Sequence, residues 1–182
     1  MTGPGGLFSC PGMSAEELIA TFEANPQRLR QVIEGLTQEE LRATPIPGKW
    51  SIQEITLHVI DTEIMAAARI RQTITDSERT FTLWDQAVWA DSLEYRNASK
   101  AELEEALALY GALRRASGYL LRRLPEEIWL RVGVHKRRGV EVSLRQLVEH
   151  HTVHSEQHIG QILERRRLLG RPIHMAPLVM TR

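Results

Sequence analysis

The chain has 182 residues, 42% of them hydrophobic, and its 23 basic side chains balance its 23 acidic ones, so the formal net charge at pH 7 is zero. This length and apolar content suit one domain with a sizeable core and exclude disorder across the whole chain. A neutral chain attracts neither phosphate backbones nor anionic lipid, which argues against nucleic acid and membrane surfaces as partners. No run of residues approaches the roughly eighteen apolar residues of a membrane-spanning helix.

Cys10 is the only cysteine, so the chain forms no internal disulfide and no thiolate metal site, and it suits a reducing cytosol. The first thirteen residues lack the basic and long apolar segments of a signal peptide. We therefore expect a cytoplasmic protein. Its predicted parts are a flexible N-terminal tail over residues 1–13, a helical domain over 14–172 and a C-terminal tail over 173–182.

Capping boxes mark the predicted helix starts. In such a box, a Ser or Thr hydroxyl accepts the backbone amide of the Glu or Gln three residues later, and the side chain of that Glu or Gln accepts the backbone amide of the Ser or Thr. In chain order the boxes are Ser14 with Glu17, Thr37 with Glu40, Ser51 with Glu54, Ser99 with Glu102, and Ser143 with Gln146. Four of them open long segments in which apolar residues recur at steps of three and four, near 14–34, 51–76, 99–124 and 143–169. Four helices of similar length predict an all-α four-helix bundle.

Shorter segments connect these helices. Thr37 opens a single turn that ends before Pro45. The connection over residues 77–98 is longer than ordinary interhelical loops, so we expect it to run the length of the bundle or to cover a functional site. Valines alternate between Arg131 and Val142 around a Gly-containing turn, which predicts a small β-hairpin before the last helix.

Histidines are concentrated on the last predicted helix, where His154 and His158 lie one turn apart and can converge on one metal ion. A third ligand must come from another element, and His58 is the only histidine on another long predicted helix. Neutral imidazoles suit zinc, nickel, copper and iron(II), whereas magnesium and calcium prefer oxygen ligands. The sequence therefore predicts one divalent transition metal bound by these three histidines.

Other interpretations of the histidines stay open. The three side chains could simply pack inside a structural bundle. A fourth ligand, His151 or His135, would close the coordination sphere and give a non-catalytic module, whereas three histidines leave one position for water or a thiolate. Glu156 does not directly follow His154, so the zinc-protease motif HExxH and its general base are absent.

Three neighbours of the predicted ligands could orient the imidazoles through hydrogen bonds. Glu54 and Asp61 lie about one turn before and after His58, and His150 lies one turn before His154. Surface salt bridges are the alternative for the two carboxylates, and packing is the alternative for His150.

Two segments resemble the DinB/YfiT-like superfamily of metal-dependent hydrolases. They are Gly48-Lys49-Trp50-Ser51-Ile52-Gln53-Glu54 followed by His58, and His154-x-x-x-His158-Ile159-Gly160-Gln161-Ile162. The resemblance spans roughly residues 14–170. The motif Trp84-Asp85-x-x-x-Trp89, together with His135 ahead of the last helix, is most similar to the YfiT branch.

The resemblance implies an up-down-down-up four-helix bundle in which His58, His154 and His158 hold zinc or nickel. It implies an enzyme that activates water or a low-molecular-weight thiol, such as bacillithiol, toward a small-molecule substrate, and relatives often form homodimers. Asp85 and His135 are then candidate catalytic residues on the open side of the metal, the alternatives being a turn aspartate and an exposed loop histidine. A non-catalytic stress-response module or a structural helical dimer is the alternative function.

Overall fold

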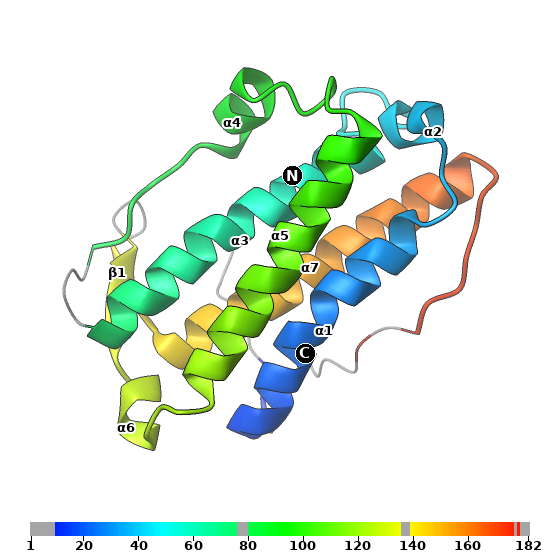
Figure 1. Ribbon diagram of the computed structural model, residues 1–182. Helices are drawn as coiled ribbons and strands as arrows, with labels where there is room; N and C mark the ends of the chain where they lie inside the picture. Colours follow the sequence, from blue (N-terminus) through cyan, green and yellow to red (C-terminus); the bar gives the residue numbers. More distant parts are fainter. Residues whose placement is uncertain (1–9, 76–79, 136–138, 177, 179–182) are drawn as a thin grey trace.

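The computed structural model describes residues 10–75, 80–135, 139–176 and 178 (Figure 1). Its long helices are α1 (Ala15–Ile33), α3 (Ile52–Thr75), α5 (Lys100–Leu121) and α7 (Leu144–Leu168). The shorter elements are α2 (Gln38–Arg42), α4 (Gln86–Ser92), α6 (Glu126–Trp129), β1 (Val132–His135) and β2 (Val140–Ser143). The predicted all-α bundle with a small hairpin before the last helix is confirmed.

All five predicted capping boxes form. At α1, α2, α5 and α7, the capping hydroxyl accepts the amide of the third helical residue, whose side chain accepts the amide of the cap. At α3, the Ser51 amide donates to Glu54 Oε2 over 2.8 Å and the Glu54 amide donates to Ser51 Oγ over 3.2 Å. Each long helix therefore begins directly after its predicted cap.

The long helices form an up-down-down-up bundle, in which α1 and α7 run one way and α3 and α5 the other (Figure 1). Packing contacts join α1 with α7, α7 with α3, α3 with α5, and α5 with α1. Because α3 and α5 point in the same direction, the chain must return along the bundle between them. The described part of the long connection, residues 80–99 with α4, makes this return.

The hairpin anchors the beginning of this connection. β1 pairs antiparallel with β2, and the Phe81 amide donates to the Val134 carbonyl over 3.0 Å. Gly133 is required opposite the Phe81 ring, because a Cβ at that position would lie 2.2 Å from Phe81 Cζ. The ring thus fixes the path of the chain that leads to Trp84.

The core consists of two apolar clusters with a polar layer between them. The first cluster includes Leu29, Ile55, Val59, Leu107 and Ile159, and the second includes Phe22, Ile70, Leu121, Leu147 and Val148. Arg114 is only 1% exposed. It lies on α5 between Leu107 of the first cluster and Leu121 of the second. A charge in this position requires full compensation by hydrogen bonds.

The Arg114 guanidinium receives that compensation from the other three long helices. Its five N–H groups donate to Glu63 Oε2 (2.6 Å), the Phe22 carbonyl (3.1 Å), Asn25 Oδ1 (3.1 Å), the His151 carbonyl (3.1 Å) and Ser155 Oγ (3.2 Å). These partners match the five donors of an arginine. The guanidinium carbon also lies 3.6 Å from the centroid of the Phe22 ring.

A proline supplies one of these acceptors. Pro26 lies inside α1 and has no N–H, so the Phe22 carbonyl one turn earlier loses its helical donor. Arg114 Nη1 donates to that carbonyl instead. The interaction therefore compensates α1 for its internal proline.

The predicted tails lie partly outside the described residues, and the predicted domain boundaries stay predictions. Within the described part of residues 1–13, Cys10 is 1% exposed and packs in the second apolar cluster. None of the helices that the structure describes is both long and apolar enough to cross a bilayer.

Truncating Glu63 tests the central ion pair, whose two side chains are 0% and 1% exposed. We expect Glu63→Ala to lower the free energy of unfolding by about 3–5 kcal/mol, because Arg114 stays buried without its counter-charge. The matched control is Glu104→Ala, since the Glu104–Arg30 pair is exposed and such pairs contribute about 1 kcal/mol or less. Urea unfolding measures both, and equal losses would contradict the central role of Arg114.

Candidate metal centre

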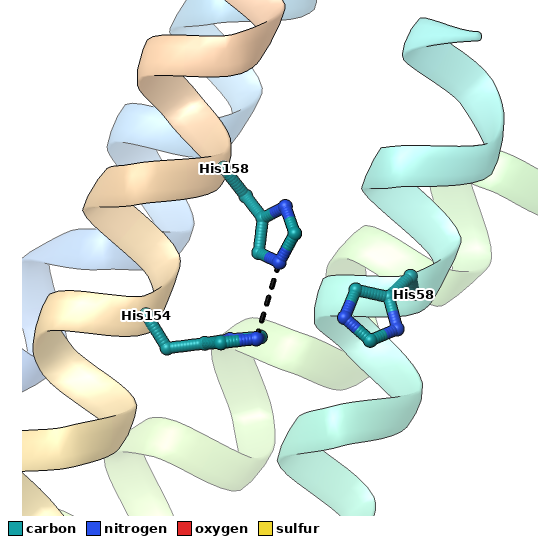
Figure 2. Close-up of side chains that lie close together, drawn as sticks. All are labelled: His58, His154 and His158. Carbon is teal, nitrogen blue, oxygen red and sulfur yellow. Dashed lines mark hydrogen bonds between the residues drawn. The ribbon is translucent and has the colours of Figure 1, made fainter. Parts of the chain in front are cut away.

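Three imidazoles converge between α3 and α7 (Figure 2). One potential ligand atom from each of His58, His154 and His158 lies within 4.8 Å of the others. The Nε2 atoms of His154 and His158 are 3.1 Å apart, and the His58 ring centroid lies 4.8 Å from that of His158 and 5.4 Å from that of His154. The structure brings together all three histidines that the sequence predicts as ligands.

The helices produce this convergence from simple spacing. His154 and His158 are one turn apart on α7 and share a face. α3 packs against α7 in the opposite direction, so one residue in the first half of α3 meets that face. His58 occupies this position and is 2% exposed.

The donor set fits a divalent transition metal. Two imidazole nitrogens on a tetrahedral ion, with bonds of about 2.0–2.1 Å, lie about 3.3 Å apart, close to the observed 3.1 Å between the two Nε2 atoms. Nδ1 of His58 is buried and has no hydrogen-bond partner among the described residues. Gln161 Oε1 accepts from Nδ1 of His158 over 3.2 Å, which leaves the lone pair of that ring on Nε2.

All three imidazoles are held in the neutral form that binds metals. Burial, followed by the neighbouring charge of His158, lowers the pKa of His58 to about 3. Burial also lowers the pKa of His158 to about 4, and it holds the pKa of His154 well below its ordinary value. Each ring is therefore uncharged at neutral pH and offers one nitrogen lone pair to a metal.

Indole rings surround the His58 imidazole. Trp50 lies 5.0 Å from it, and Trp84 stacks on it at 5.7 Å with an interplanar angle of 25°. Trp89 packs against Trp84 at 4.8 Å. These rings give the His58 side of the site an apolar wall.

A cavity of about 410 Å³ adjoins two of the three converging histidines, His58 and His154. Its lining includes the ligand candidates His58 and His154, the catalytic candidates Asp85 and His135, and also His150, His151, Thr62 and Arg69. Asp85 Oδ1 caps α4, accepting the amides of Ala87 over 2.9 Å and Val88 over 3.2 Å. The structure thus places Asp85, His135 and His150 around the same space as the metal-binding candidates.

Two of the carboxylates on α3, those predicted to orient an imidazole, contact the long connection. Glu54 accepts from Arg96 Nε over 2.8 Å, and Asp61 accepts from the Tyr95 hydroxyl. Burial raises the pKa of Asp61, and the Tyr95 hydrogen bond opposes that shift. These two hydrogen bonds therefore hold residues 95–96 against α3, and the predicted role of Glu54 and Asp61 in orienting an imidazole stays a prediction.

Sequence reasoning missed part of the cavity wall. Thr62 and Arg69 lie four and eleven residues after His58 on α3 and line the cavity with it. Those intervals recur on one face of a helix, so the position of His58 could have identified both. Glu156, which the sequence excludes as the general base of an HExxH motif, binds Arg28 through both carboxylate oxygens.

Comparisons with known proteins agree with this geometry. The model of the DinB superfamily matches residues 21–162. Two relatives carry the name "Putative metal-dependent hydrolase". YfiT from Bacillus subtilis is 24% identical over 155 residues, and the match covers 85% of each chain. A protein from Oceanobacillus iheyensis is 26% identical over 146 residues, and the match covers 80% of this chain and 82% of the relative.

A solved structure shares the fold. Bacillus subtilis YfiT, described as "a probable metal-dependent hydrolase with an unusual four-helix bundle topology", superposes with a TM-score of 0.80 at 24% identity, covering 88% of this chain and 91% of that one. The match to the superfamily model extends from α1 to α7 and includes all three converging histidines. The chain therefore belongs to the DinB superfamily.

Proposed function

We propose that the chain is a metal-dependent enzyme that activates water or a low-molecular-weight thiol toward a small-molecule substrate, by hydrolysis or thiol S-transfer. The observation that carries the proposal is the cavity of about 410 Å³ that reaches two of the three converging imidazoles. The names of the relatives, which describe metal-dependent hydrolases, support the same reaction class.

The residues around the cavity have distinct roles in this proposal. His58, His154 and His158 would hold a divalent ion, and that ion would supply the Lewis acidity that lowers the pKa of water or a thiol. The indoles of Trp50 and Trp84 pack against His58 and form an apolar wall beside that site.

Two candidates can move a proton within the cavity. His135 and Asp85 both line it. We assign the transfer to His135 ahead of Asp85, because Oδ1 of Asp85 is already bound to the amides of α4. A neutral imidazole can accept a proton from an attacking group and return it to a leaving group.

A non-catalytic metal module is the competing function. It predicts a fourth protein ligand and no space beside the metal. Within the described part of the chain, three histidines form the ligand group, and the adjoining cavity has room for a small molecule. These observations favour catalysis.

Zinc and nickel are the ions we propose for three neutral imidazoles. Cys10 is buried in the second apolar cluster, so a nucleophilic thiol would come from solution. A cytoplasmic location and a homodimeric state complete the proposal, in keeping with the family resemblance.

Metal binding is the first test. We expect purified protein to bind one equivalent of zinc or nickel, and His58→Ala and His158→Ala to weaken binding by more than about 100-fold, since even groups behind the ligands contribute 10–100-fold. His174→Ala is the matched control, because His174 is exposed outside the bundle. Competition with a chromophoric chelator measures affinity, and unchanged binding by the first two variants would contradict the site.

Turnover is the second test. Metal-loaded protein is expected to hydrolyse activated esters or amides, or to add a small thiol to an epoxide or a chlorinated aromatic. Chelation or His58→Ala should lower the rate by at least about 100-fold, because Lewis acidity contributes several kcal/mol to such barriers. His174→Ala should retain the rate. A chelator-resistant rate, or inactivity with both substrate classes, would count against a metal-dependent enzyme.

The buried imidazoles also predict a pH dependence of stability in metal-free protein. The folded pKa values of His58 and His158, about 3 and about 4, lie below their ordinary value of 6.5, so protonation favours the unfolded chain. The stability they contribute is present above pH 6.5 and is lost as the pH falls toward 4 and 3. At pH 5, protonation of His58 lowers the free energy of unfolding by about 2 kcal/mol. When urea unfolding is measured at pH 7 and at pH 5, the difference in the free energy of unfolding should therefore be about 2 kcal/mol smaller in His58→Ala.

A further inference from the structure

Two polar residues continue the face of α7 that carries the metal-binding candidates His154 and His158. Gln161 follows His158 by three residues, and Arg165 follows Gln161 by four. Residues at these intervals lie one above the other on a helix. The described lining of the cavity includes neither Gln161 nor Arg165. The contacts that these two side chains make with the site therefore lie outside the cavity.

The Gln161 side chain contacts the His158 imidazole. Its Oε1 accepts a hydrogen bond from Nδ1 of that ring over 3.2 Å. An amide oxygen can only accept, so Nδ1 carries the single N–H of the neutral imidazole. Nε2 of His158 is then left with a lone pair, and this is the nitrogen that faces His154 (Figure 2).

The same hydrogen bond decides the tautomer of His154. Nε2 of His154 lies 3.1 Å from Nε2 of His158, within hydrogen-bonding distance. Two imidazole nitrogens form a hydrogen bond only when one of them carries a proton and the other a lone pair. Because His158 holds its proton on Nδ1, His154 must be the donor. The contact with Gln161 is therefore transmitted from one ring to the next.

Arg165 fixes the turn of α7 that carries Gln161. It is 5% exposed, and its Nη1 donates to the Gln161 carbonyl over 3.0 Å. Its Nε donates to the Trp50 carbonyl over 2.8 Å, and the Trp50 ring lies 5.0 Å from that of His58. One buried guanidinium thus joins this turn to the segment that precedes α3. The Gln161 backbone is anchored, although its side chain is exposed.

We propose that Gln161 is a positioning residue that sets the tautomers of both metal-binding candidates on α7. In metal-free protein, His158 holds its proton on Nδ1, and His154 donates its Nε2 proton to the lone pair of His158. The inference rests on the proposed function, because a preset lone pair on His158 matters for the ion that this nitrogen would bind. Partners of this kind contribute about 10–100-fold to metal affinity.

The tautomers can be measured without a metal. Nitrogen-15 NMR of metal-free protein at pH 7 distinguishes a protonated from an unprotonated ring nitrogen, once each ring is assigned by through-bond correlation to its own backbone. We expect a protonated Nδ1 on His158 and a protonated Nε2 on His154. In Gln161→Leu, which removes the acceptor, His158 should populate both tautomers. A residue with a merely structural role would not change this pattern.

Zinc affinity measures the consequence of the positioning. In competition with a chromophoric chelator, Gln161→Leu should weaken zinc binding by about tenfold or more. Gln161→Glu keeps an acceptor for Nδ1–H and should bind zinc at least as tightly as the wild-type protein. Gln157→Leu and Gln157→Glu are the matched controls, because Gln157 is also exposed on α7 and directly precedes His158. Both controls should leave the affinity nearly unchanged.

The outcomes separate this inference from the proposed function. A protonated Nε2 on His158 in the wild-type protein, or a zinc affinity that Gln161→Leu leaves unchanged, overturns the positioning role alone. A loss that Gln161→Glu does not restore, or that Gln157→Leu reproduces, overturns it too, because such a loss is a general effect on the helix. Failure of the wild-type protein to bind zinc or nickel overturns the proposed function, and the NMR measurement then still decides whether Gln161 sets the tautomers.

Discussion

The buried guanidinium of Arg114 is the constraint on which the rest of the bundle depends. It binds acceptors on α1, α3 and α7 at once, so these helices cannot slide relative to one another without breaking a charge-assisted hydrogen bond. His151 and Ser155, which accept from it, flank His154 on α7, and Glu63 lies five residues from His58 on α3. The register that brings the three histidines together is therefore set by a residue whose described hydrogen bonds go to other side chains and to the backbone.

The polar layer and the candidate site are parts of one arrangement. Apolar clusters above and below the layer supply most of the burial, while the layer specifies how the helices align. Beside the layer, the long connection carries Trp84 and Asp85. Its path is fixed by Phe81, which binds the hairpin, and by Tyr95 and Arg96, which bind carboxylates of α3. Precise alignment allows ordinary helical spacing to produce a convergent site.

Features governed by local rules could be predicted from the sequence. Helix starts follow from capping boxes of four residues, and the ligand pair follows from one turn of α7. Non-local features could not be predicted. Arginine is mostly found on solvated surfaces, so the sequence gives no sign that Arg114 is buried. Its partner Glu63 is fifty-one positions away. The carboxylates of Glu54 and Asp61 bind residues 95–96, which depends on the path of the long connection and not on their spacing from His58.

Pro26 makes the folding of α1 conditional on its neighbour. Without α5 in place, the Phe22 carbonyl has neither its helical donor nor Arg114 Nη1. A partly assembled bundle would also leave Arg114 facing an apolar interior with few acceptors. States in which only two or three helices have docked are therefore penalised twice, and the chain gains its full stabilisation only when all four assemble. An interior proline and a buried charge, each unfavourable alone, together make folding more nearly all-or-none.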